Sequence, residues 1–416
     1  MPLTFCPAFL IKIINQNKSM SNIDFKKVVI PDLGVGAFEN FSQMYPILNH
    51  VILSKPTWDD SRDGKVKEIL NFKTIIDNPY RRLVGGYKRN ENVFFLLAEA
   101  MWIFAGHSDV KFLCFFNKNM AKFSDNGEVF HAPYGFRLRH WGVRTEDKFV
   151  EENMHASQGY DQVADAIKIF EANPNTRQVV LTIWNPDFDL GTKTKDIPCN
   201  DMVMLKIRGG KMITTIQNRS NDLHWGLPTN LFQFSFLTEL ISSCLCVELG
   251  TQTHNSQSLH IYDWNDIANV MEHEYASGNN VELYTSGATE RRIDFKFSHS
   301  VPGNRLREID YHLELIIRNL TRVADGGKDE PEEIKALAEF SDYLHKVYHL
   351  LKIYLEYKAG IAVCKDEEVM HSERQTALGK INTLVGEDTN WDVAIMAKNF
   401  FAAKLPEYNH PFIGKL

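Results

Sequence analysis

Asp196-Ile-Pro-Cys199-Asn200, followed by Gln217-Asn-Arg219-Ser220-Asn-Asp222-Leu-His-Trp-Gly226-Leu-Pro-Thr-Asn230, is the stretch with the densest chemistry in this sequence. It places one cysteine after a proline, then a cation, a hydroxyl, a carboxylate and an amide. A nearby positive charge lowers the pKa of a thiol and so makes it a better nucleophile. We therefore predict that Cys199 is a nucleophile and that Arg219 activates it if the fold brings them together.

Five further motifs flank this stretch along the chain. Together with it, they resemble the active-site segments of the thymidylate synthase family, in the family's order, over roughly residues 58 to 265. That family includes the pyrimidine nucleotide hydroxymethylases. Any one motif is weak, but their order around a single Pro-Cys is a strong signal. The motifs are Asp60-Ser-Arg62-Asp-Gly64, Leu97-Ala-Glu99-Ala-Met-Trp102, Ala132-Pro-Tyr134-Gly135, Thr176-Arg177-Gln178 and Ser258-Leu-His260-Ile-Tyr262.

The resemblance implies transfer of a one-carbon unit to C5 of a pyrimidine nucleotide. The Cys199 thiolate would add to C6, which turns C5 into a nucleophile toward 5,10-methylenetetrahydrofolate. Glu99 and Tyr134 match residues that relay protons through water. The expected folate contacts are Asp222, Trp102 and Gly226, although a tryptophan in an apolar helix is as often part of the core.

The phosphate of such a substrate is bound well by arginine, because the planar guanidinium can donate two parallel hydrogen bonds to phosphate oxygens. By resemblance, Arg62, Arg219 and Ser220 bind the phosphate from one subunit, whereas Arg177 reaches it from the other. This implies a homodimer. Gln178 stands where the family often has a second arginine, so we expect phosphate binding to be weaker or differently shared. A lone loop arginine such as Arg62 is otherwise a solvated charge.

Asn230 is expected to select the base. An amide accepts from uracil N3–H and donates to O4, whereas cytosine presents the reverse pattern. The structural alternative is a helix N-cap, because an apolar run begins at this position. Asn200 stands where synthases usually have a histidine that organises water near O4. His260 and Tyr262 match the pair that binds the ribose 3′-hydroxyl.

Water access decides between a methyl and a hydroxymethyl product. The segment 116–123 contains no tryptophan, and the chain ends Pro411-Phe-Ile-Gly-Lys-Leu416 rather than in the family's small apolar tail. Both features favour a deoxyuridylate hydroxymethylase with a wet site. The alternatives are a thymidylate synthase shielded by other helices, a (d)CMP hydroxymethylase, which Asn230 disfavours, and a catalytically silent relative that binds nucleotide or RNA.

Composition restricts the partners. The 416 residues carry a net charge of 46 − 53 = −7, so a basic footprint for direct DNA binding is absent, and a small anionic substrate is favoured. Six cysteines without disulfide spacing indicate a reducing cytoplasm, in a bacterium or a phage-infected host. We expect no metal site, because Cys244 and Cys246 lie in an apolar run as small core residues. No run is long enough to span a membrane.

The pattern of elements favours an α+β fold, with a mixed, mainly antiparallel sheet packed against helices, as in thymidylate synthases. We expect residues 1–20 to be disordered or extended, residues 21–302 to form the catalytic domain and residues 303–416 to form a helical extension. The sequence predicts strands at 67–77, 179–184, 202–207, 212–217 and 257–262, and helices at 92–105, 160–172, 230–246, 307–324, 332–357 and 391–403.

Overall fold

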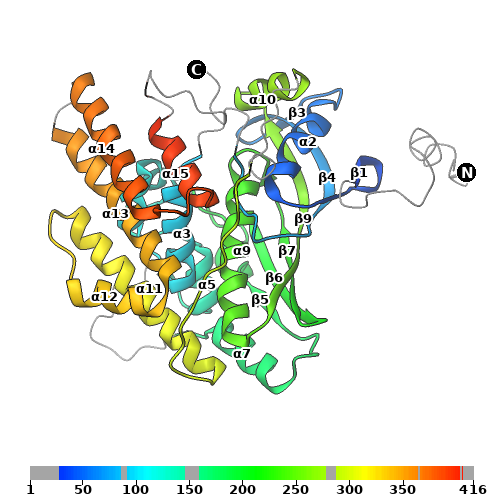
Figure 1. Ribbon diagram of the computed structural model, residues 1–416. Coiled ribbons are helices and arrows are strands. Elements are labelled where there is room, and N and C mark those ends of the chain that lie inside the picture. The colour runs from blue at the N-terminus through cyan, green and yellow to red at the C-terminus, as the bar shows by residue number, and fades with distance from the viewer. Residues whose placement is uncertain are drawn as a thin grey trace, which may run out of the picture.

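A computed structural model of the protein describes residues 28–85, 91–145, 159–277, 287–363, 366–402 and 405. The predictions for residues 1–20 and for the chain end 411–416 lie outside these ranges. The described residues form one nine-stranded sheet covered by helices (Figure 1). The strands are β1 (Val28–Ile30), β2 (Val35–Phe38), β3 (Asp59–Ser61), β4 (Gly64–Ile76), β5 (Val180–Thr182), β6 (Asn200–Arg208), β7 (Lys211–Asn218), β8 (Asn221–Asp222) and β9 (Glu248–Tyr262).

The sheet is mixed, in the order β1-β2-β4-β9-β7-β6-β5, with β3 paired to β4 and β8 paired to β9. The pairs β2–β4, β7–β9 and β8–β9 are parallel, and the other strand pairs in the described residues are antiparallel. The predicted α+β class is confirmed. The two long central strands, β4 and β9, lie side by side, and β9 carries His260 and Tyr262 at its end.

The hairpin β6–β7 forms as the sequence predicts. Arg208 pairs with Lys211, and the two residues between them, Gly209 and Gly210, have φ angles of 57° and 73°. Two positive φ angles in a two-residue turn match the right-handed twist of the flanking strands, and glycine adopts them without steric cost. The hairpin fixes the register of β6 against β7, which places Cys199 and Arg219 side by side at the other end of these strands.

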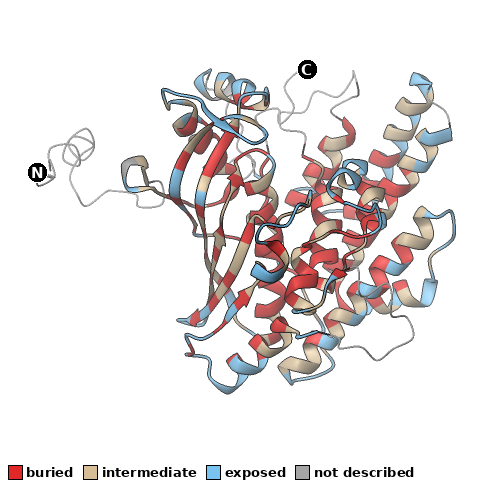
Figure 2. Ribbon diagram, turned by 180° about the vertical axis from the view of Figure 1, so that it is seen from behind, coloured by how far each residue is buried: buried red, intermediate tan, exposed pale blue. Residues whose placement is uncertain are grey.

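The helices form layers on one side of the sheet. Helix α9 packs on β9 and β7, α3 packs on α9, and α11, α13 and α15 pack on α3 (Figure 1). Buried residues gather between these layers (Figure 2). The helices are α2 (Phe41–Leu53), α3 (Val93–Ala105), α4 (Val110–Phe116), α5 (Tyr134–Arg139), α7 (Gln162–Ala172), α8 (Pro186–Asp189), α9 (Gly226–Leu245), α10 (Ile267–Ala276), α11 (Pro302–Ala324), α12 (Pro331–Phe340), α13 (Asp342–Val363), α14 (Glu367–Val385) and α15 (Asp392–Ala402), with 3₁₀ turns η2 (Pro31–Leu33) and η3 (Lys118–Phe123).

The single helix predicted over 332–357 is wrong, because Ser341 separates α12 from α13. Ser341 is extended, with φ −154° and ψ 118°. Its hydroxyl accepts a hydrogen bond from Leu344 N at 3.1 Å, and the Asp294 carboxylate accepts from the amides of Asp342 and Tyr343. These side chains satisfy the orphan amides of the first turn of α13, so a new helix starts there at little cost. Helix α14 was not predicted.

The helices after residue 302 share their core with the catalytic region. One cluster of buried apolar side chains includes residues of α3, α9 and α11 to α15. Tyr354 of α13 stacks on Phe94 of α3 with ring centroids 4.7 Å apart and donates a hydrogen bond to Phe116 O. The cysteine prediction holds only in part, since Cys244 is buried but Cys246 is exposed. None of the described helices is both long and apolar enough to cross a membrane.

Candidate active site

Cys199 and Arg219 lie at adjoining ends of the hairpin strands. Cys199 directly precedes β6, and Arg219 directly follows β7, so antiparallel pairing brings them together. Arg219 N donates to Cys199 O at 3.0 Å, and Arg219 Nη2 lies 3.6 Å from Cys199 Sγ. The same guanidinium donates to Pro198 O at 2.8 Å and to Ile197 O at 3.0 Å. The predicted pairing of thiol and cation is therefore present in the fold.

Arg219 does not by itself turn the thiol into a thiolate. Burial raises the pKa of Cys199, and the positive charge of Arg219 only partly opposes this effect. Because desolvation disfavours the charged form, the free protein holds Cys199 as a thiol at neutral pH. The proton must leave during the reaction, when negative charge moves from sulfur into the substrate.

Glu99 lies on α3, and Tyr134 begins α5 and lies next to Cys199. Burial raises the pKa of Glu99 to about 8, although Gln233 donates a hydrogen bond to its carboxylate. Glu99 is therefore mostly protonated at neutral pH and can act as an acid. Tyr134 begins α5 and stacks on Phe234 with centroids 6.2 Å apart. Burial also raises the pKa of Tyr134 well above its usual value.

A chain of buried amides runs from β7 to Asn230. Asn218 Nδ2 donates to Asn200 Oδ1, and Asn200 Nδ2 donates to Asn230 Oδ1 at 3.1 Å. Asn230 Nδ2 then donates to Asn221 Oδ1 at 3.3 Å, and Asn221 Nδ2 to Ser256 Oγ at 3.1 Å. All five residues are buried. The chain fixes which end of the Asn230 amide is oxygen and which is nitrogen.

Helix α9 starts at Gly226, four residues before Asn230. The N-cap interpretation of Asn230 is therefore wrong, because this residue lies in the second turn of the helix. The prediction failed because Gly226-Leu-Pro-Thr reads as a loop, whereas proline is well tolerated in the first turn of a helix. The side chain of Asn230 is thus free of a capping role.

His260 and Tyr262 lie at the end of β9, beside the loop that carries Arg62. Their rings meet edge to face, with centroids 4.9 Å apart. Trp264 stacks on Tyr262 and donates from Nε1 to Asp63 O at 3.1 Å, which ties the Arg62 loop to β9. The Arg62 side chain is 81% exposed and pairs with its neighbour Asp63 at 2.8 Å. This arginine must leave Asp63 to bind a phosphate.

Arg177 and Ser220 occupy different places. Ser220 follows Arg219 directly, between β7 and β8. Arg177 is exposed and precedes β5, the edge strand. Because Leu205 N donates to Val179 O, Arg177 lies beside the far end of β6, about 25 Å from Cys199 at the usual rise per strand residue. The fold does not bring Arg177 to the site of its own chain.

The residues expected to hold folate are divided between surface and core. Asp222 Oδ1 accepts from His224 N at 2.6 Å and from Trp225 N at 3.3 Å, beside the exposed Trp225 ring. Gly226 begins α9 next to Asn221 and Asn230. Trp102, in contrast, is 3% exposed, and its indole donates to Asp109 Oδ2 at 3.2 Å. The geometry of Trp102 matches the core alternative.

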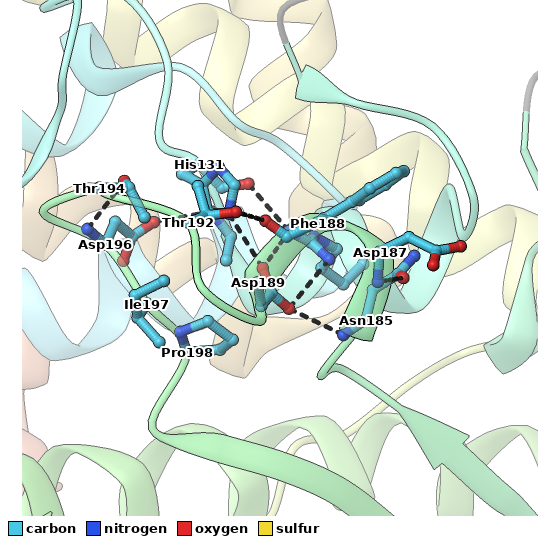
Figure 3. Close-up of polar contacts among 12 residues, drawn as sticks. His131, Asn185, Asp187, Phe188, Asp189, Thr192, Thr194, Asp196, Ile197 and Pro198 are labelled. Carbon is cyan, nitrogen blue, oxygen red and sulfur yellow. Dashed lines mark hydrogen bonds and ion pairs between the residues drawn. The ribbon is translucent and has the colours of Figure 1, made fainter.

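Sequence reasoning missed a polar cluster that leads into the Cys199 loop (Figure 3). Asp189 is fully buried and accepts from His131 Nε2 and Arg137 Nη2, both at 2.9 Å. Asp196, farther along the same loop, accepts a hydrogen bond from Ala132 N at 2.8 Å. A carboxylate three residues before the nucleophile was the available signal for Asp196. The Asp189 cluster has no such signal, since its partners are 52 and 58 residues away in sequence.

Comparison with known proteins identifies the family. The sequence profile described as Thymidylate synthase matches residues 48–323, which is more than half of the chain. The chain belongs to the thymidylate synthase family. This confirms the predicted family, and the mixed sheet packed with helices is that of a thymidylate synthase domain.

Individual relatives within the thymidylate synthase family carry two kinds of name. The chain is similar to the deoxyuridylate hydroxymethyltransferases of Bacillus phage SP01, at 41% identity over 53% of this chain and 57% of the relative, and of Pseudomonas phage M6, at 34% over 49% and 54%. It is also similar to thymidylate synthase 1/2 of Encephalitozoon cuniculi (strain GB-M1), at 33% over 31% and 42%. The chain thus spans little more than half the length of the two phage relatives.

Proposed function

We propose that this protein is a deoxyuridylate hydroxymethyltransferase, which converts dUMP to 5-hydroxymethyl-dUMP. The observation that carries the proposal is the Cys199–Arg219 pair beside an Asn230 amide whose orientation is fixed by neighbouring amides. This arrangement combines a nucleophile for C6 with a reader of uracil. The names of the two phage relatives support the same activity.

The reaction begins when Cys199 Sγ attacks C6 and its proton leaves. Negative charge then develops on O4, where the Asn230 N–H and the protonated Glu99 stabilise it. Bound 5,10-methylenetetrahydrofolate supplies the one-carbon unit that C5 attacks, as is general for the family. The half-exposed Asp222 carboxylate is suited to the N–H donors of a pterin. Tyr134 stays a neutral phenol and orders water beside C5.

Hydroxymethylation requires that water reach the one-carbon unit. The 3₁₀ turn Lys118–Phe123, which lacks the tryptophan expected in a synthase, buries none of its side chains. This open segment supports a hydrated site. The second candidate is a thymidylate synthase, which the Encephalitozoon cuniculi relative favours.

A homodimer completes the proposed site. Because Arg177 lies far from Cys199 in the same chain, a second subunit is the way in which it can reach a bound phosphate. We place the enzyme in a reducing compartment such as the cytoplasm, since Cys199 must remain a thiol. Cys114, Cys199, Cys244 and Cys246 are free.

Mass spectrometry of the product tests the proposal. The purified protein is incubated with dUMP and methylenetetrahydrofolate, and the folate absorbance is followed. We expect 5-hydroxymethyl-dUMP, with tetrahydrofolate released. Formation of dTMP together with dihydrofolate would instead establish a thymidylate synthase. The Cys199→Ala variant is the control, because it should bind dUMP without turnover; no turnover by either protein would indicate a silent nucleotide-binding relative.

A further inference from the structure

Asp196 is a carboxylate in the active-site loop that the proposed mechanism does not yet use. It lies three residues before Cys199, so their α-carbons are at most about 10 Å apart. Its Oδ2 atom accepts from Ala132 N at 2.8 Å, in the turn that carries Tyr134. The carboxylate therefore lies between the nucleophile loop and the tyrosine turn.

The backbone around Asp196 is fixed on both sides. On the N-terminal side, the Asp125 carboxylate accepts hydrogen bonds from Thr194 Oγ1 and from Lys195 N. Asp196 N donates to Thr194 Oγ1 at 3.2 Å (Figure 3). On the C-terminal side, Arg219 holds Ile197 O and Pro198 O. Such anchoring preorganises a catalytic group, because little movement is needed at the moment of reaction.

The charge of Asp196 acts on three groups of the proposed mechanism. Burial is the main cause of the raised pKa values of Glu99, Tyr134 and Cys199, and the negative charge of Asp196 adds to the increase at each of them. Burial also raises the pKa of Asp196 itself, which makes it a stronger base than an exposed aspartate. One carboxylate thus acts on residues from α3, α5 and the nucleophile loop.

We propose that Asp196 is the general base that activates the water molecule of the hydroxymethylation step. The inference rests on the proposed function, because a methyl transfer contains no such water. It assigns to Asp196 a role distinct from that of Glu99, which is bound to Gln233 and acts as an acid toward O4. In this proposal, the water molecule binds between the Asp196 carboxylate and the exocyclic carbon attached to C5.

The step balances as follows in atoms and charge. After the folate has left, the nucleotide carries Cys199 at C6 and a methylene group doubly bonded to C5. The water oxygen bonds to that methylene carbon, its proton goes to Asp196, and the double-bond electrons move through C5 to O4. The resulting enolate re-forms the C5–C6 double bond and expels the Cys199 thiolate. Asp196 then returns its proton to solvent, and the product is 5-hydroxymethyl-dUMP.

Two variants test whether Asp196 acts as a general base or only accepts the hydrogen bond from Ala132 N. Asp196→Asn keeps an oxygen for Ala132 N but cannot take a proton, whereas Asp196→Ala removes both functions. If Asp196 is the base, both variants form 5-hydroxymethyl-dUMP about 100-fold more slowly, within the usual range for loss of a general base. If it only holds Ala132, Asp196→Asn turns over like the unmodified protein. That result would overturn the proposal.

Two further measurements show at which step the Asp196→Asn variant stops. They use dUMP labelled with tritium at C5 and added 2-mercaptoethanol. Tritium leaves before water attacks, and a thiolate adds to the methylene without a general base. The Asp196→Asn variant should therefore still release tritium and should accumulate the thioether nucleotide. Loss of tritium release with retained dUMP binding would contradict the assignment, because it places the defect before the water step.

The following controls distinguish a failure of the base assignment from a failure of the proposed function. Asp201→Asn removes another carboxylate whose charge acts on Cys199 and should leave the ratio of hydroxymethyl to thioether product unchanged. If Asp196→Asn fails to fold, rescue of Asp196→Ala by formate decides the question, and its absence counts against the base. If the unmodified protein makes dTMP, the proposed function has failed; if it makes 5-hydroxymethyl-dUMP and Asp196→Asn does too, only the base assignment has failed.

Discussion

Base selection at the residue scale depends on amide orientation. Asn200 donates a hydrogen bond to Asn230 Oδ1, and Asn221 accepts one from Asn230 Nδ2. If the Asn230 amide alone were flipped, its NH₂ group would face the NH₂ group of Asn200 and its oxygen would face the oxygen of Asn221. The remaining lone pair and N–H of Asn230 match N3–H and O4 of uracil. Cytosine would meet an acceptor with an acceptor and a donor with a donor.

Replacement of Asn230 by Asp should therefore shift the preference from dUMP toward dCMP. A carboxyl group accepts from the cytosine amino group and, when protonated, donates to N3. We expect the ratio of kcat/KM values to move by at least about 100-fold, as for loss of a paired hydrogen bond in a buried site. Steady-state kinetics with both nucleotides measures the ratio, with Thr229→Ser on the same helix turn as a control. An unchanged ratio would refute the role of Asn230.

We expect the buried Glu99 carboxyl, which acts as an acid, to lower the stability of the folded protein at neutral and higher pH. Its folded pKa of about 8 exceeds the usual value near 4.5, so the folded state holds a proton that the unfolded chain has lost. Stability is therefore fully present below about pH 4.5 and falls as pH rises to about 8. Glu99→Gln should be about 2–3 kcal/mol more stable than the unmodified protein at pH 8 and no more stable at pH 4.5. Its turnover should fall about 100-fold or more.

Thermal unfolding at both pH values, combined with product assays, checks this prediction. Gln233→Ala serves as the comparison, because it removes the partner of Glu99 but keeps the titrating carboxyl. Equal pH dependence in Glu99→Gln and the unmodified protein would show that Glu99 does not hold the extra proton.

Sequence reasoning at this scale identified residues better than it identified their partners. The Cys199–Arg219 contact could be predicted because both lie at the ends of a recognisable hairpin. Asn218 and Asn221 were in the quoted stretch but received no role, since their contacts with Asn200 and Ser256 depend on the register of β6, β7 and β9. Side-chain hydrogen bonds across strands do not follow from local pattern.

At the scale of elements, α5, which carries Tyr134, packs closely against α3, which carries Glu99. A Cβ atom on Gly135 would lie 1.8 Å from Ile103 O and 2.6 Å from Ile103 Cα, both backbone atoms. Only glycine fits between these helices. The Ala-Pro-Tyr-Gly motif thus requires its glycine for helix packing.

Gly135→Ala should destabilise the protein by about 3 kcal/mol, because α5 must move away from α3. Turnover should be lost as well, since Tyr134 moves with α5. Gly379→Ala is the matched control: Gly379 lies in α14 with nothing within 4 Å of an added Cβ, so this change should stabilise by up to about 1 kcal/mol. Denaturant unfolding compares the variants, and equal stabilities would contradict the packing argument.

Elements with clear periodicity were predicted well, and those with polar strands were not. The hairpin β6–β7 and helix α3 match their predicted bounds within about two residues. The first half of β9, from Glu248 to Ser256, was missed because Thr, Gln, His and Asn replace the usual apolar residues. These polar side chains tolerate burial because several bond within the core, as Gln252 does with Leu231 O and His254.

The whole molecule joins a catalytic sheet to a helical layer without a break in the core. The family profile ends at residue 323, inside the structure's helical layer, and α11 packs directly on α3, α7 and α9. Arg139 of α5 binds Asp310 of α11 at 2.8 Å, which adds a partly buried ion pair to the apolar contact. The helices after residue 302 therefore support α3 and its Glu99 rather than forming a separate unit.

The proposed dimer makes the most demanding prediction about the whole molecule. If Arg177 serves the site of the partner subunit, Cys199→Ala and Arg177→Ala homodimers should each be inactive. A mixed dimer would then hold one site in which both residues are intact, because Arg177 of one subunit completes the Cys199 site of the other. Random reassembly of equal amounts should restore about a quarter of full activity, since half of the dimers are mixed and each has one working site.

The assay compares turnover before and after co-refolding of the two variants. Arg208→Ala, mixed in the same way with Cys199→Ala, controls for the effect of losing a cation near the far end of β6. If Arg177 acted within its own subunit, each site of the mixed dimer would lack one residue and no activity would return. Recovery near a quarter would show that the active site is shared between chains, as we propose from the distance of Arg177 from Cys199 along β6.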